Sequence, residues 1–142
     1  VVRRRVVWAL GQIEDEDALA PLERALRDRS PEVRQMALWA IGEIESPQGV
    51  PMLEGMAGDA DPDARRMAAW ALGEIESVDA VRHLTPLLRD AEEDVRAVAA
   101  WALGEIESAS ALPALEAAMK DDRSPTVRHA ARWAIAQIDD RR

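Results

Sequence analysis

Apolar residues recur every three or four positions along this chain, in segments that are alternately long and short. In the long segment 31–44, a helical wheel at about 100° per residue gathers an apolar face from Val33, Ala37, Ala40, Ile41 and Ile44. The short segments carry stripes of three apolar residues: Leu19, Leu22 and Leu26, then Val50, Leu53 and Met56, then Val81, Leu84 and Leu88, then Leu112, Leu115 and Met119. The pattern predicts nine helices, joined by turns of two to five residues, in which successive helices are antiparallel neighbours.

Capping residues and prolines mark where these helices begin. The pairs Ser30-Pro31, Asp61-Pro62 and Ser124-Pro125 each place a capping side chain before a proline in the first turn of a long helix. Glu92-Glu93 replaces this signal in the fourth long helix, so we expect its start to be the loosest. Pro86 lies deep in a short helix and predicts a kink or a delayed start.

The same unit is repeated at a nearly fixed period. Tryptophan occurs at residues 8, 39, 70, 101 and 133, at successive intervals of 31, 31, 31 and 32. Glycine has the same period at Gly11, Gly42, Gly73 and Gly104, and Ala136 occupies the fifth equivalent position. A period of this length indicates an array whose hairpins are stable only when stacked. We predict a single domain over residues 1–142, an all-α solenoid of about four and a half two-helix repeats.

The first helix, residues 1–13, has no short partner before it and the chain does not open on Met. We interpret the chain as a piece of a longer protein or an engineered sequence. Without a preceding helix, Val2, Val6, Ala9 and Ile13 would face water, which predicts fraying, self-association or a missing preceding segment.

The amino-acid composition limits the classes of partner that the protein could bind. The net charge of −9 repels phosphate groups and argues against nucleic acid, and the absence of any run of 18 apolar residues argues against a membrane span. The absence of cysteine excludes disulfides but does not separate cytosol from periplasm, and a cytoplasmic location is favoured. A protein or peptide partner with cationic or apolar groups fits this charge.

Residues for catalysis or metal binding are not found in a suitable pattern. His83 and His129 fall on different kinds of helix two repeats apart, which does not fit a metal site or a Ser–His pair. Glu43, Glu74 and Glu105 are too evenly spread to form a pair in which one pKa is raised. We expect no enzyme activity, no cofactor and no metal.

The tryptophans lie about 140° from the centre of the buried face on the helical wheel. They either pack between adjacent long helices about 8 to 10 Å apart, or form a stripe that binds a peptide by apolar contact, cation–π attraction and carboxylate pairing. Both interpretations can hold together. The candidate partner-binding residues are Trp8, Trp39, Trp70, Trp101, Trp133, Glu43, Glu74, Glu105, Met36, Met67, Arg66 and Gln35.

An arginine column follows the same period at residues 3, 34, 65, 96 and 128. Each arginine is close in register to an aspartate of a turn, namely Asp28, Asp59, Asp90 or Asp121. We interpret the column as a structural ladder between repeats rather than a phosphate site.

The string WALGEIES, present at residues 70–77 and again at 101–108, resembles the short HEAT-like repeats of the phycobilin-lyase type, on which consensus-designed alpha-helical repeat scaffolds are also based. The resemblance implies a right-handed superhelix whose long helices line the concave side. The positions varied in the designed relatives match the columns of Trp39, Glu43, Gln35 and Met36. The final copy departs from the pattern at Arg132, Ala136 and the inserted residue in 121–123, which suits a capping unit.

The leading hypothesis is a noncatalytic protein–protein interaction scaffold that binds a partner peptide or helix on the concave tryptophan and glutamate surface. A bilin-lyase-like subunit that handles an open-chain tetrapyrrole is one alternative. The other is a structural module that self-associates end to end through its N-terminal half-repeat.

Overall fold

The computed structural model describes residues 2–13 and 16–140, and within these ranges every regular element is helical. The long helices are α1 (Val2–Ile13), α3 (Pro31–Ile44), α5 (Pro62–Ile75), α7 (Glu93–Ile106) and α9 (Pro125–Asp139), and the short helices are α2 (Leu19–Ala25), α4 (Val50–Ala57), α6 (Val81–Leu84) and α8 (Leu112–Asp121). Short 3-10 turns lead into the short helices at η1 (Glu16–Ala18), η2 (Pro47–Gly49), η3 (Val78–Ala80) and η5 (Ala109–Ala111). The predicted alternation of nine α-helices is therefore confirmed for the described part of the chain.

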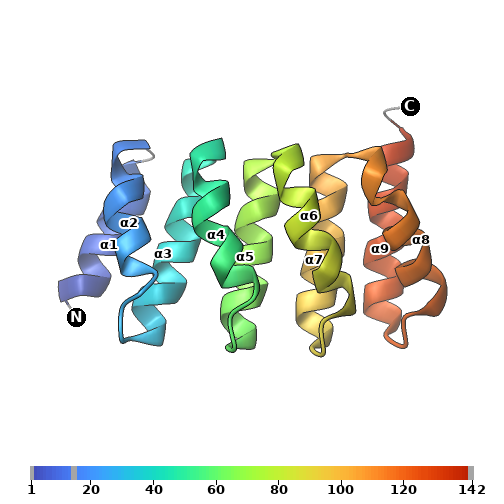
Figure 1. The fold of residues 1–142 in the computed structure, drawn as a ribbon, viewed down its shortest axis with the longest axis horizontal. Helices are drawn as coiled ribbons and strands as arrows, with labels where there is room; N and C mark the ends of the chain where they lie inside the picture. Colours follow the sequence, from blue (N-terminus) through green and yellow to red (C-terminus); the bar gives the residue numbers. More distant parts are fainter. Residues whose placement is uncertain (1, 14–15, 141–142) are drawn as a thin grey trace.

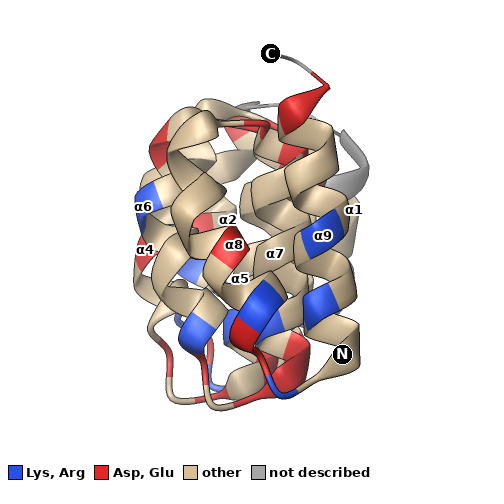
Figure 2. Ribbon diagram, turned by 90° about the vertical axis from the view of Figure 1, so that its right-hand side faces the viewer, with Lys and Arg blue, Asp and Glu red and all other residues tan. Residues whose placement is uncertain are grey.

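The helices form two layers, with the short helices in front of the long ones in Figure 1 and to their left in the end-on view of Figure 2. Each long helix packs against the next, from α1 to α9, and α2, α4 and α8 each pack against the long helix that follows them. The short helices contribute one fully buried leucine apiece to the space between the layers: Leu22, Leu53, Leu84 and Leu115. A hairpin of this size buries its apolar stripe only against its neighbours, so the core runs the length of the array.

The starts of the long helices follow the sequence signals. The Ser30 and Ser124 hydroxyls accept hydrogen bonds from the backbone N–H groups of Val33 and Val127, and the Asp61 carboxylate accepts one from Asp63. Glu92, at the start of α7, caps its helix with no side-chain hydrogen bond. Among α3, α5, α7 and α9, the helices whose caps are described, α7 alone begins without a side-chain cap, which agrees with the prediction that its start is the loosest.

Pro86 interrupts the third short helix. The α-helix ends at Leu84 and the chain continues as the 3-10 segment η4 (Thr85–Arg89). Proline has no N–H to donate and its ring crowds the preceding turn, which ends the regular ladder. The Thr85 hydroxyl donates to the Val81 carbonyl at 2.8 Å. The disruption predicted at Pro86 is therefore a change of helix type rather than a delayed start.

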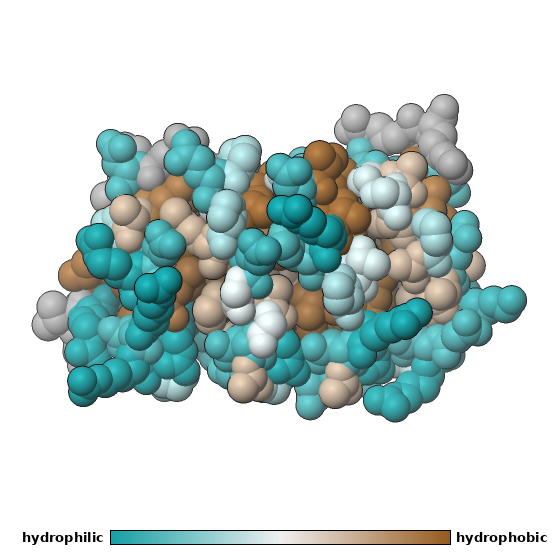
Figure 3. All heavy atoms as spheres, in the orientation of Figure 1, coloured by the Kyte–Doolittle hydropathy of each residue, from teal (hydrophilic) through white to brown (hydrophobic). Residues whose placement is uncertain are grey.

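A repeated arginine and aspartate junction ties successive units together. The Arg96 guanidinium binds both carboxylate oxygens of Asp122, at 2.9 and 3.3 Å, and also donates to the Asp90 carbonyl at 2.9 Å. Arg65 binds Asp90 in the same way, at 2.8 and 3.1 Å. These pairs confirm the structural ladder, which lies along the charged lower edge seen in Figures 2 and 3.

The ladder corrects the sequence analysis at one residue. The partner of Arg96 is Asp122 and not Asp121, because the inserted residue in 121–123 shifts the register by one. Burial alone would raise the pKa of Asp90, but hydrogen bonds from Arg65 and from the backbone N–H of Glu92 hold that pKa below its ordinary value. The carboxylate of this junction consequently stays ionised.

The two ends of the array differ in character. At the N-terminal end, Val6 is 52% exposed and Ala9 is exposed, as predicted, whereas the side chains of Val2 and Ile13 lie outside those described. At the C-terminal end the outward positions are filled by exposed Arg132 and Ala136. The equivalents of Arg132 in the inner repeats are buried apolar residues, Leu38, Ala69 and Ala100. The last unit therefore exposes a charged side chain at a position where the inner repeats bury an apolar one.

Candidate functional site

The tryptophan column lies on the long-helix layer and is partly accessible along its whole length. Trp8 is 53% exposed and Trp133 is 36% exposed, at the two ends. Trp39, Trp70 and Trp101 are partly buried and pack against the edge of the core. The structure therefore confirms packing of the inner indoles between long helices, while leaving part of each ring on the surface.

Each of three indoles rests on a glycine of the preceding long helix. A Cβ placed on Gly42 would lie 2.6 Å from Cζ3 of Trp70, and one on Gly73 would lie 2.7 Å from Cζ3 of Trp101. Gly104 stands in the same relation to Trp133, at 2.6 Å. No real side-chain carbon is accommodated at such distances, so glycine is required wherever a following tryptophan covers the helix. This contact explains the shared period of the two residue types.

The predicted buried face of the long helix was right in most places. Val33, Ala37, Ala40 and Ile41 are buried, but Ile44 is only partly buried. Leu38, which the wheel placed outside that face, is completely buried. The wheel considered one contact surface per helix, whereas stacking covers both flanks of a long helix as well as its inner face.

A hollow of about 440 Å³ brings several predicted site residues together at the N-terminal end of the array. Its lining is Arg4, Trp8, Glu32, Gln35, Met36, Trp39 and Met67, from α1, α3 and α5. Five of these seven side chains were predicted from their spacing alone. The hollow lies between successive indoles, on the side toward the N-terminal ends of the helices.

A second hollow of about 600 Å³ lies between Trp101 and Trp133 at the other end of the same face. It is also lined by Pro125, Thr126, His129 and Ala130. These four residues were missed by the sequence analysis. Their register could have indicated them, because His129 and Ala130 occupy the places that Gln35 and Met36 hold in the second unit.

Carboxylates lie one helical turn beyond the tryptophans. Glu43, Glu74 and Glu105 are partly buried, as is Arg66 on the opposite side of Trp70. Burial, together with repulsion by neighbouring glutamates, raises the pKa values of Glu74 and Glu105 above their ordinary value. The sequence analysis, which expected no raised pKa from the even spacing of these glutamates, did not take into account their partial burial, the main cause of the increase.

The additional carboxylates come from the residues that end the long helices. Glu45, Glu76 and Glu107 adopt left-handed backbone conformations, with φ of 54°, 55° and 57°. Glycine or asparagine is the usual occupant of such a position, because a Cβ there meets the backbone. The sequence instead repeats Glu at this place, which doubles the number of carboxylates along the edge of the tryptophan column.

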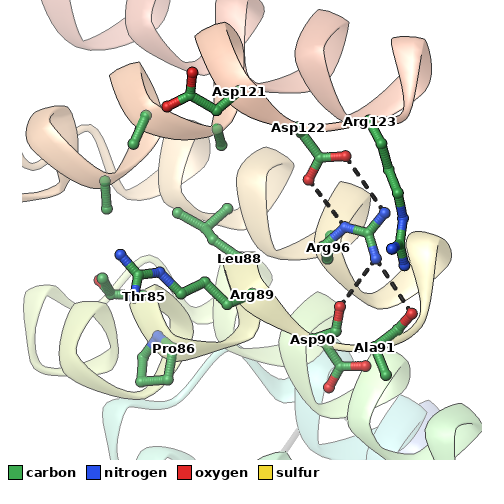
Figure 4. A pocket seen from close by; sticks show the side chains of 13 residues that line it. Thr85, Pro86, Leu88, Arg89, Asp90, Ala91, Arg96, Asp121, Asp122 and Arg123 are labelled. Atoms are coloured by element: carbon green, nitrogen blue, oxygen red, sulfur yellow. Dashed lines mark hydrogen bonds and ion pairs between the residues drawn. The ribbon is translucent and has the colours of Figure 1, made fainter.

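A third hollow lies elsewhere and was not predicted. It measures about 800 Å³ and lies between η4 and α8, on the short-helix side (Figure 4). Its floor holds Leu88 and small alanines of α8, and its lining includes three arginines and three aspartates. Arg96 is bound to Asp122 and to two backbone carbonyls there (Figure 4). Arg96, Asp90 and Asp122 serve the junction between repeats, so we place the candidate site on the tryptophan face.

Two kinds of feature are absent from the part of the chain that the structure describes. Histidine, aspartate and glutamate side chains form no group of three or more there that could hold a metal ion. None of the described helices is long and apolar enough to cross a bilayer. The tryptophan face therefore offers apolar contact, π surface and negative charge.

Comparison with known proteins gives a family match over nearly the whole chain. The family model described as HEAT repeats matches residues 1–61 and 51–136. No curated protein sequence matches the chain significantly.

Several solved structures have the same fold. The complex of CpcE and CpcF of phycocyanin lyase from a Nostoc species matches with a TM-score of 0.83 at 23% identity. The match covers 97% of this chain and 59% of the matched chain of that complex, so this chain spans less than two thirds of the length of its relative. A designed armadillo repeat protein in complex with the peptide (KR)4 matches with a TM-score of 0.68 at 26% identity, over 95% of this chain and 74% of that chain. An engineered protein matches with a TM-score of 0.71 at 23% identity, over 96% and 73%.

Proposed function

Because this chain belongs to the HEAT-repeat family, we propose that it is a noncatalytic scaffold that binds an extended segment or helix of a partner protein across its long-helix layer. The observation that carries the proposal is the pair of hollows between successive indoles, one at each end of the same face. Aromatic residues that remain partly exposed in a row supply large contact areas with few rotatable bonds, which favours binding.

The charge of this face indicates what kind of segment it accepts. Glu43, Glu74 and Glu105 lie one helical turn beyond the tryptophans, and Glu45, Glu76 and Glu107, which end the same helices, repel Glu74 or Glu105. Repulsion among them contributes to the raised pKa values of Glu74 and Glu105, and a nearby cation would relieve it. The armadillo design of the same fold is bound to a peptide of Lys and Arg, which supports a basic segment as the partner here.

A binding measurement with defined peptides tests this proposal. An octapeptide of alternating Lys and Arg is titrated into the protein by calorimetry, next to an octapeptide of alternating Glu and Asp. We expect saturable binding of the basic peptide and none of the acidic one. Absence of binding by any basic or apolar peptide of this length would remove the scaffold proposal in this form.

Variants locate the binding surface. Trp8→Ala removes an indole that is 53% exposed, so it should weaken binding several-fold while changing stability little. Val78→Ala is the matched control, since Val78 is 67% exposed in η3, away from the tryptophan column. Equal affinities for both variants and the parent protein would show that the peptide binds elsewhere. Replacing Trp70 or Trp101 is less informative, because each of these rings also packs on a glycine.

The likeness to the phycocyanin lyase complex favours a second candidate, a subunit that handles an open-chain tetrapyrrole. Mixing the protein with a bilin and recording the visible spectrum tests it directly. A red or blue shift of the bilin absorbance that is lost in Trp8→Ala would support this candidate. An unchanged spectrum at concentrations of tens of micromolar would count against it.

A third candidate, end-to-end self-association, rests on exposed Val6 and Ala9 at the N-terminal end. Light scattering over a concentration series distinguishes it from a monomeric scaffold. We expect a Val6→Glu variant to abolish any association that depends on this surface.

A further inference from the structure

The tryptophan face has a repeat distance that constrains the conformation of its partner. Successive long helices pack directly against one another, and packed helices lie about 8 to 10 Å apart. The indoles and the glutamates follow this spacing, because each unit of the array supplies one copy, and the two hollows lie between successive indoles at the two ends of the row. A partner segment that binds in register must present the same chemistry once every 8 to 10 Å or so.

Regular backbone conformations differ in how well they meet this condition. A polyproline II helix rises about 3.1 Å per residue with three residues per turn, so every third side chain points the same way after about 9.3 Å. A β-strand repeats its side-chain direction after about 6.6 Å, and an α-helix after about 5.4 Å. Of these three repeat distances, only that of the polyproline II helix falls within the spacing of the long helices.

The chemistry of the face also suits this conformation. Polyproline II segments are typically recognised by grooves lined with aromatic rings, and the hollow at Trp8 and Trp39 is such a groove, with Met36 and Met67 completing its apolar lining. The glutamates lie on the other side of the indoles, one helical turn further along each long helix. A segment lying along the column therefore meets apolar surface on one side and carboxylates on the other.

We propose that the partner of this face is a polyproline II segment with a basic residue at every third position, bound at one turn per repeat. Its prolines or other apolar residues fill the hollows between indoles, and its basic side chains reach the series Glu43, Glu74 and Glu105. This inference rests on the proposed scaffold function and specifies the partner of that same site.

Two peptides of identical composition test the spacing. Both have twelve residues, four Arg and eight Pro: one repeats Arg-Pro-Pro four times, and the other repeats Arg-Pro four times and ends in four prolines. Both favour polyproline II, because a residue that precedes proline is biased toward it. The first spans about 37 Å in this conformation with one Arg per repeat, whereas in the second only the first and fourth Arg keep the three-residue register and the two between them fall out of it.

We expect the Arg-Pro-Pro peptide to bind about threefold more tightly than its permuted counterpart, because it can pair one Arg with each of the three glutamates, whereas the counterpart reaches only the outer two. The double variant Glu74→Gln and Glu105→Gln should remove most of this difference. The control is Glu116→Gln, an exposed residue of α8 in the short-helix layer, which should leave the difference between the two peptides unchanged.

The outcomes separate the two proposals. Equal binding of both peptides overturns the three-residue register and leaves the scaffold function standing. A preference that survives the double variant overturns the pairing of the basic residues with Glu74 and Glu105. Failure of these two peptides, with saturable binding of the alternating Lys-Arg octapeptide, overturns the polyproline II conformation alone. Failure of all three peptides counts against the scaffold function itself.

Discussion

Replacing Gly73 by alanine tests the contact that sets the spacing of this array. Gly73 lies in the last turn of α5, where the indole of Trp101 from α7 covers it. A Cβ added there would lie 2.7 Å from Cζ3 of Trp101, 2.9 Å from the Cα of Ala102 and 2.9 Å from the Ala102 Cβ. Relaxed carbon contacts are about 3.5 to 4.0 Å, so the new methyl group overlaps by roughly 1 Å.

Two effects of opposite sign decide the outcome. Alanine is favoured over glycine inside a helix by about 1 kcal/mol, whereas overpacking a tight contact costs about 1 to 3 kcal/mol. The indole alone could turn away, but Ala102 presents backbone, which moves only if α7 moves. We therefore take the upper part of that range for the overlap and expect a net loss of about 1 to 2 kcal/mol in the free energy of unfolding. The corresponding fall in Tm is roughly 3 to 6 °C.

Two further variants serve as controls. Gly55 lies in α4 with no atom within 4 Å of an added Cβ, so Gly55→Ala should raise stability by about 1 kcal/mol. Ala136 is exposed at the place equivalent to Gly73 in the last unit, and Ala136→Gly should lower stability by up to about 1 kcal/mol. Urea denaturation followed by circular dichroism at 222 nm or so measures all three. If Gly73→Ala stabilised the protein as much as Gly55→Ala, our account of the glycine and tryptophan period would be refuted.

Other substitutions probe the ladder, the helix ends and the carboxylates. Arg96→Ala should cost about 3 to 5 kcal/mol in urea denaturation, because it leaves the largely buried Asp122 carboxylate without its guanidinium partner and with only the backbone N–H of Ser124. Arg3→Ala should cost under about 1 kcal/mol, since the Arg3 side chain is 69% exposed; equal losses would contradict this. Glu76→Gly should raise the unfolding free energy by about 1 kcal/mol by relieving its left-handed backbone, and a loss of stability would instead assign Glu76 a favourable contact. Because the pKa of Glu74 is raised, its carboxyl group stays protonated to a higher pH in the folded than in the unfolded protein, so stability falls as pH rises above the ordinary value of 4.5. Glu74→Gln should therefore be more stable than the parent protein at neutral pH, by a difference that shrinks as acid is added. Melting curves from pH 4 to 8 or so measure this, and a constant difference would contradict it.

The sequence was sufficient to predict the fold because each of its signals recurs in every unit. Periodic apolar positions, a capping residue before proline and a fixed period all indicated the same hairpin, and their agreement defines the array. The signals at single positions were also informative, since Pro86 and Glu92 marked the two irregular places in the described helices. Asp122 was missed although the inserted residue in 121–123 is visible in the sequence, because the sequence does not show which of the two adjacent aspartates faces Arg96.

The candidate site was predicted less completely, for a physical reason. A helical wheel assigns a direction to each side chain of one helix, but the burial of Leu38 and of Trp70 depends on how closely the next helix approaches. That distance is set by Gly42, whose missing side chain admits the indole. The left-handed conformation of Glu45 was likewise hidden, because Glu gives no local signal for a positive φ.

The break at Pro86 has a consequence for how the molecule opens. The segment α6 and η4 keeps four α-helical residues followed by a 3-10 stretch, whose hydrogen bonds are poorer than those of an α-helix. In a repeat array, each unit is stabilised only by its neighbours, so a weak segment lowers the cooperativity between the repeats on its two sides. We therefore expect the two sides of this segment to unfold locally and independently of each other. Amide hydrogen exchange should then be fastest, among the short helices, in residues 81–89, and transient opening there would let the array flex about its third unit.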